Sequence, residues 1–257
     1  MLETILHSRT LGKGKPFLIL HGFLGMGDNW KSLGNKFSED YEVHLIDQRN
    51  HGRSFHSEDF SFKFLADDLL NYINHYKLED VILLGHSMGG KAAMLFAVTY
   101  PEIVKKLIIA DISPRIYPMH HQDILTALNE VDFDVQKSRT AIEEVLEKYI
   151  PQFGVRQFLM KNVARNGKEG YKYRFNLKTL TENYNEIVVG LPSDAHFEKE
   201  ALFLSGEKSG YIGIDDVPLI ETHFSKSKIV TVKNAGHWLH ADNPTQFYDE
   251  VVSFLDK

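Results

Sequence analysis

Six short runs of apolar residues recur along the chain, each four residues long. They lie at 17–20, 43–46, 81–84, 107–110, 201–204 and 229–232. Runs that are nearly continuous in apolar character are typical of strands buried on both faces, as in a parallel sheet. Between most of them, apolar residues return every three or four positions. This spacing predicts helices, the clearest of them at 61–76, 88–99 and 244–256. Strands that alternate with helices predict an α/β protein with a mostly parallel, doubly wound sheet.

The alternation is interrupted once, over residues 114–198. No convincing buried strand occurs there, and four helical patterns follow one another, at about 121–130, 138–149, 153–164 and 178–189. We expect this segment to be a helical insertion between two strands of the sheet and not a separate domain. The core would then comprise residues 1–113 and 199–257.

Composition narrows the class of protein. The 257 residues include no cysteine, which excludes a disulfide framework, a thiolate metal site and a cysteine nucleophile. Lys and Arg number 29 and Asp and Glu 35, a net charge of −6 that argues against a general nucleic-acid binder. The chain does not start like a signal peptide, and no run reaches the ~18 apolar residues of a membrane span. We therefore expect a cytoplasmic protein with no membrane partner. The sequence leaves its oligomeric state open.

The motif G-x-S-x-G appears where the third predicted strand meets a predicted helix, as Gly85-His86-Ser87-Met88-Gly89. In this context the motif is typical of a nucleophile on a strained strand-to-helix turn. Residues two before and two after the serine must lack side chains so that strand and helix can approach. The turn directs the serine Oγ into open space and leaves backbone N–H groups free at the helix N-terminus, where negative charge is favoured.

A serine nucleophile needs a base, and the chain offers thirteen histidines. His237 is the best candidate, because it follows the last predicted strand and parallel strands end on the same sheet edge. His86 is expected to support the serine turn, and His51 and His240 are expected to be structural. The pair His120-His121 lacks metal-ligand partners at suitable spacing, so we expect it at the surface.

The tetrahedral intermediate of acyl transfer requires two N–H donors for its oxyanion. Met88, directly after Ser87, supplies one of them. The loop 21–25, which follows the first predicted strand, is placed to supply the other, and we assign it to the N–H of Phe23.

The whole chain resembles the α/β-hydrolase superfamily, which has the order nucleophile, acid, histidine. The likeness is carried by His21-Gly22, Asp47-Gln48-Arg49-Asn50-His51-Gly52-Arg53-Ser54, the serine turn 85–90 and Gly236-His237. More narrowly it resembles the YbfF-type esterases, through His21-Gly22-Phe23-Leu24-Gly25, Asp28-Asn29-Trp30 and Asp111-Ile112-Ser113-Pro114. The resemblance implies a cap in the place of the insertion and cleavage of small acyl esters, with acyl-CoA thioesters as a further class.

The triad acid is where the chain departs from most of the superfamily. The usual position follows the strand 201–204, and there the chain has Ser209 in place of Asp. The resemblance to the subgroup assigns the acid to Asp111 instead, at the end of the neighbouring strand. Three other carboxylates compete for the role, namely Glu207, Asp215 and Asp216.

These residues together predict a serine hydrolase that cleaves carboxylic esters of short to medium acyl chains. Trp238 and Leu24 are expected to line the substrate pocket, and no metal or organic cofactor is implied. Asp47 and Arg49 are expected to brace a turn. Two alternatives remain open: a carbon–carbon bond hydrolase or lyase with the same triad, and a non-catalytic ligand receptor of the same fold. The serine nucleophile argues against dehalogenase or epoxide hydrolase chemistry, for which related folds use Asp.

Overall fold

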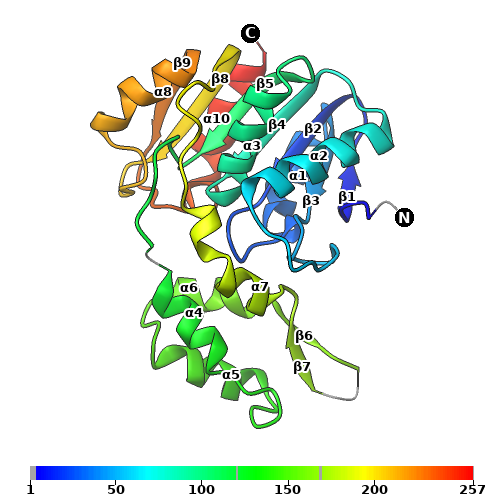
Figure 1. Ribbon diagram of the computed structural model, residues 1–257, viewed down its shortest axis with the longest axis vertical. Coiled ribbons are helices and arrows are strands. Elements are labelled where there is room, and N and C mark those ends of the chain that lie inside the picture. The colour runs from blue at the N-terminus through cyan, green and yellow to red at the C-terminus, as the bar shows by residue number, and fades with distance from the viewer. Residues whose placement is uncertain (1–3, 120, 168–169, 257) are drawn as a thin grey trace.

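The computed structural model describes residues 4–119, 121–167 and 170–256, so His120 lies outside the described residues. A seven-stranded sheet forms its centre (Figure 1). The first strand pairs antiparallel with its neighbour and all other pairs are parallel. In spatial order the strands are β1 (Ser8–Leu11), β3 (Tyr41–Ile46), β2 (Lys15–Leu20), β4 (Val81–His86), β5 (Val104–Ala110), β8 (Phe197–Gly206) and β9 (Phe224–Val232).

All six predicted strands are present, and both faces of the sheet are buried. In β2, for example, Leu18 and Leu20 belong to one core cluster and Phe17 and Ile19 to the other. The edge strand β1 was not predicted, because Ser-Arg-Thr-Leu contains no apolar run. It becomes a strand by pairing with β3.

Helices cover both faces of the sheet, with α2 and α3 on the side toward the viewer in Figure 1. Side chains cap two of these helices: Ser61 accepts the Phe64 N–H at the start of α2, and Asn243 accepts the Gln246 N–H at the start of α10. The helices of this part are α1 (Lys31–Phe37), α2 (Phe62–Tyr76), α3 (Met88–Thr99), α8 (Val217–His223), α9 (Leu239–Asp242) and α10 (Pro244–Leu255), with short 3₁₀ turns at η1 (Gly27–Trp30) and η3 (Ile214–Asp216).

The residues between β5 and β8 form a separate layer of helices at one end of the sheet (Figure 1). The elements are α4 (Gln122–Asn129), α5 (Arg139–Glu147), α6 (Phe153–Met160), β6 (Val163–Arg165), β7 (Tyr171–Tyr173), α7 (Leu177–Glu182) and η2 (Tyr184–Ile187). The four predicted helices are present, and the segment also contains a short antiparallel strand pair that is mostly not buried. The antiparallel pair β6–β7 ends the third helix four residues earlier than predicted. Strands of three residues are too short to give a periodic signal.

A buried lysine joins this segment to the sheet. The Lys91 ammonium, on α3, donates hydrogen bonds to the carbonyls of Pro114 and Val189, both at 2.9 Å, and to that of Arg115. Pro114 and Arg115 lie where the polypeptide enters the segment, and Val189 lies where it returns to the sheet. The same side chain therefore fixes both connections beside the helix that follows Ser87.

Candidate active site

Ser87 lies on the turn between β4 and α3 with strained backbone angles, φ 53° and ψ −117°. The flanking glycines are required by close approaches. A Cβ on Gly85 would lie 2.2 Å from the Gly89 carbonyl oxygen, and one on Gly89 would lie 2.5 Å from that of His21. The Ser87 N–H donates to the Ala110 carbonyl at 3.1 Å, which anchors the turn to the neighbouring strand.

The structure brings Ser87, His237 and Asp111 together at the carboxyl edge of the sheet. His237, in the loop after β9, places Nε2 3.0 Å from Ser87 Oγ and Nδ1 2.7 Å from an Asp111 carboxylate oxygen. Asp111 directly follows β5, is fully buried and also accepts the Gly206 N–H at 2.9 Å. These partners fix the His237 ring with a proton on Nδ1 and leave Nε2 free to accept the serine proton.

Ser209 explains the missing acid of the usual superfamily position. Its hydroxyl donates to the same Asp111 oxygen that contacts His237, so the chain after β8 supports the acid in place of supplying it. The sequence showed that Ser209 stands where most of the superfamily has Asp, but it did not predict the hydrogen bond from Ser209 to Asp111. A serine three residues after the strand-ending Gly206 was the available signal.

The competing carboxylates have other partners. Glu207 accepts the Asn234 N–H at 2.7 Å and pairs with Lys233 at the surface. Asp216 is buried against Ser113 and Arg115, at 2.7 and 2.9 Å. Asp215 is exposed. Asp111 is therefore the carboxylate that the fold delivers to His237.

Several neutral histidines surround the site. Burial lowers the pKa of His21 to about 4 and the pKa of both His51 and His240 to about 3. Burial also holds the pKa of His86 well below its usual range, and its Nε2–H donates to the His237 carbonyl at 2.8 Å. His86 thus supports the His237 loop. These four rings stay uncharged near neutral pH and do not oppose a positive charge that develops on His237.

The backbone N–H groups of Phe23 and Met88 make no hydrogen bond among the described residues. The Phe23 loop is nevertheless held firmly on both sides. The Leu24 N–H donates to His51 Nε2 at 3.3 Å, and its carbonyl accepts the Asn162 side chain at 2.8 Å. Two buried donors beside a serine hydroxyl suit an anionic oxygen.

The turn-bracing roles expected for two residues of the 47–54 segment agree with the contacts. Asp47 accepts the N–H groups of Gly27 and Arg53, at 2.7 and 2.9 Å. Arg49 forms a two-pronged ion pair with Asp68, at 2.5 and 2.7 Å. Neither side chain lines the cavity at Ser87.

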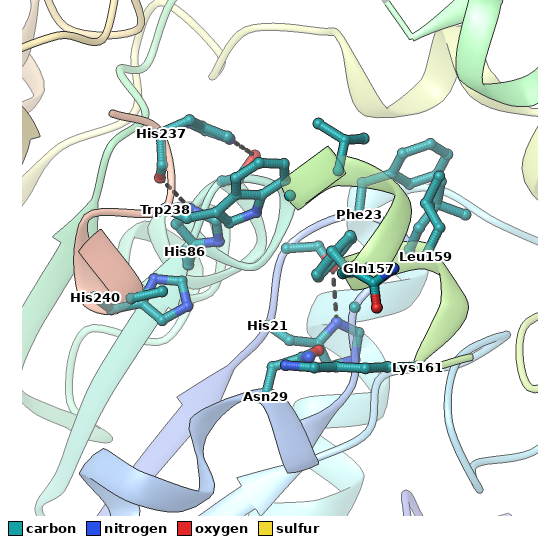
Figure 2. A pocket seen from close by; sticks show the side chains of 18 of the residues that line it. His21, Phe23, Asn29, His86, Gln157, Leu159, Lys161, His237, Trp238 and His240 are labelled. Atoms are coloured by element: carbon teal, nitrogen blue, oxygen red, sulfur yellow. Dashed lines mark hydrogen bonds between the residues drawn. The ribbon is translucent and has the colours of Figure 1, made fainter. Parts of the chain in front are cut away.

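A cavity of about 300 Å³ opens at Ser87, and Leu24 and Trp238 both line it. Figure 2 shows His237 and Trp238 on one side and α6, with Gln157 and Leu159, on the other. Phe158 of α6 packs against Trp238 with ring centroids 5.4 Å apart. The inserted segment therefore forms one wall of the cavity.

The surface position expected for His121 is wrong. Its ring lines the cavity, and its Nδ1 lies 2.7 Å from the Tyr184 hydroxyl. The ring also packs 5.6 Å from that of Phe23. The fold of the insertion, which the sequence pattern did not give, brings it there. Within the described ranges, no group of three or more His, Asp or Glu side chains is arranged to hold a metal ion.

Residues 15–244 match the family model of the alpha/beta hydrolase fold. The chain belongs to this family. It is 35% identical over 254 residues to the sn-1-specific diacylglycerol lipase ABHD11 of Danio rerio, covering 95% of this chain and 79% of that protein. It is 29% identical over 242 residues to Esterase YbfF of Escherichia coli, covering 94% and 93%. A solved structure named Marine microorganism esterase has a TM-score of 0.95 and 42% identity, covering 98% of this α/β-hydrolase and 99% of that chain.

These relatives confirm the predicted fold and the predicted likeness to YbfF-type esterases. In the described part of this α/β-hydrolase, no helix combines the length and apolar character needed to cross a membrane.

Proposed function

We propose that this protein is a serine hydrolase of carboxylic esters. The hydrolase class has the support of relatives named as an esterase and a lipase. The single observation that carries the mechanism is the continuous chain from Ser87 Oγ through His237 to the buried carboxylate of Asp111, with contacts of 3.0 and 2.7 Å.

In this mechanism Ser87 Oγ attacks the acyl carbonyl carbon while His237 Nε2 accepts the serine proton. The N–H groups of Phe23 and Met88 stabilise the oxyanion, and Asp111 stabilises the imidazolium. His237 then returns the proton to the leaving oxygen, which departs as an alcohol. Water, deprotonated by His237, attacks the acyl-enzyme and releases the acid.

We assign esters of short to medium acyl chains to this site. Acyl-CoA thioesters are a second class of substrate, because the same steps would expel a thiol in place of an alcohol. The insertion 114–198 acts as the cap that limits the substrate. Its support is the wall formed by α6 and the hydrogen bond from Asn162 to Leu24 at 2.8 Å. A site covered in this way should hydrolyse emulsified long-chain triglycerides far more slowly than butyrate esters.

Active-site labelling tests the proposal. A fluorophosphonate probe should modify Ser87 alone, and Ser87→Ala should lose labelling and about a million-fold in kcat. Ser205→Ala is the matched control, because Ser205 is a buried serine on β8 that contacts Thr231 at 3.1 Å. It should label normally. A label mapped to another residue refutes the mechanism, and the absence of an acyl-enzyme burst with simple esters favours a non-catalytic receptor.

A further inference from the structure

Two cavities of very different size meet at Ser87. The larger, of about 300 Å³, extends beneath α6. The smaller, of about 30 Å³, lies between the start of α3 and the chain that returns from the insertion, where Met88, Ile187 and Val188 bound it. Ser87 and Phe23 line both cavities. An ester held at the serine hydroxyl therefore has two unequal spaces for its two halves.

The position of His237 distinguishes the two cavities. Its ring lines the larger one together with Trp238, whereas the described lining of the smaller one does not include it. A general acid must lie within about 3 Å of the atom it protonates, so the leaving oxygen has to face the larger cavity. In the proposed mechanism the N–H groups of Phe23 and Met88 bind the oxyanion. The smaller cavity is then the space left for the acyl chain.

We infer that the smaller cavity is the acyl site and favours the shortest acyl chains, while the larger cavity takes a bulky, largely apolar alcohol. The inference rests on the proposed function. The smaller cavity has about a tenth of the volume of the larger one, so it has room for a short acyl chain and none for a bulky group. The larger cavity is at the lower end of the range of small-molecule sites.

Hydrogen bonds hold the aromatic walls of the acyl site in place. The Tyr117 hydroxyl accepts the Ser113 N–H at 2.8 Å and donates to the Tyr211 carbonyl. The Tyr184 hydroxyl lies 2.7 Å from His121 Nδ1 and accepts the N–H of the same residue at 3.1 Å. Because moving these rings would break buried hydrogen bonds, the cavity should not widen readily for a longer chain.

A matched series of 1-naphthyl esters tests this assignment. The alcohol is constant and the acyl group runs from acetyl through propionyl and butyryl to hexanoyl. We expect kcat/KM to fall along the series, by about tenfold or more between acetyl and hexanoyl, because one methylene that does not fit an apolar pocket costs about 10- to 200-fold. A parallel acetate series should show kcat/KM rising from methyl through butyl to naphthyl alcohol. Equal kcat/KM values for the acetate and the hexanoate overturn the inference.

Paired variants locate the selectivity. Ile187→Ala removes a wall of the smaller cavity and should raise the hexanoate-to-acetate ratio of kcat/KM at least about tenfold. Val188→Ala should act in the same direction and serves if the first variant does not fold. Val155→Ala, on α6 in the larger cavity, is the control and should change alcohol preference alone. If Val155→Ala shifts the acyl ratio and Ile187→Ala does not, the two cavities have been assigned the wrong way round.

Failure of this inference is distinguishable from failure of the proposed function. A protein that is labelled at Ser87 but hydrolyses hexanoates as fast as acetates refutes the cavity assignment alone. A protein that is not labelled and hydrolyses no ester refutes both.

Discussion

Asp111→Asn is the most informative single change, because the carboxylate has three donors around it. One oxygen accepts the Gly206 N–H at 2.9 Å. The other accepts the Nδ1–H of His237 at 2.7 Å and the hydroxyl of Ser209. An asparagine offers one oxygen and one NH₂ group to these partners. Whichever way the amide turns, it must direct its own donors at a donor of the surrounding protein.

The two orientations have different costs. If the NH₂ faces His237, Nδ1 must act as the acceptor, the ring proton moves to Nε2, and Nε2 no longer accepts from Ser87. If the NH₂ faces Gly206, a fully buried N–H loses its acceptor, at a cost of about 1–3 kcal/mol in the free energy of unfolding. Both remove the charge that stabilises the imidazolium.

The change should therefore lower kcat about ten-thousand-fold, the loss typical of a triad Asp changed to Asn. At 1.36 kcal/mol per factor of ten, this is about 5.4 kcal/mol of transition-state stabilisation. It should also lower the free energy of unfolding by about 1–3 kcal/mol when the amide keeps its oxygen toward His237.

The assay is kcat with 1-naphthyl acetate, measured on the pH plateau of the wild type, with urea denaturation alongside. Glu207→Gln and Asp215→Asn are controls, because neither carboxylate contacts His237, and each should keep kcat within a few-fold. If Asp111→Asn keeps most of its activity while a control loses it, the acid belongs after β8 and the assignment of Asp111 is wrong.

Three further outcomes are expected. Gly85→Ala should destabilise the fold by more than about 3 kcal/mol in thermal melts, because its Cβ would meet a backbone oxygen at 2.2 Å. Gly154→Ala is the control, because it lies in a helix and its Cβ would have no neighbour within 4 Å, and it should be neutral or slightly stabilising. Ser209→Ala removes a donor to the triad carboxylate and should lower kcat about ten- to a hundredfold with the urea midpoint little changed. Burial, and then the charge of Arg115, lower the pKa of Lys91 to about 7. Between about pH 7 and pH 10 the unfolded chain binds more protons at Lys91 than the folded chain does, so the free energy of unfolding rises with pH. Urea titrations at pH 7 and pH 9 should show a smaller rise for Lys91→Met than for the wild type. An equal rise in both proteins would refute the role of this group.

Local pattern alone determined most of the sheet and the serine turn. A strand buried on both faces must be apolar at every position, so six of the seven strands were visible in the sequence. The serine turn was visible for a steric reason, because the approach of Gly85 to Gly89 admits no side chain. The edge strand β1 and the short pair β6–β7 left no such pattern, since pairing with a neighbour, not burial, makes them strands.

The choice of acid and the shape of the site depended on tertiary structure. Four carboxylates remained candidates in the sequence, and the order of strands β5, β8 and β9 brings Asp111 to His237 while Ser209 supports it from the chain between β8 and β9. The two cavities arise where the insertion packs against the sheet edge. Their sizes depend on which side chains from distant segments line the same space, as Ile187 and Met88 do, and no spacing along the chain encodes such an arrangement.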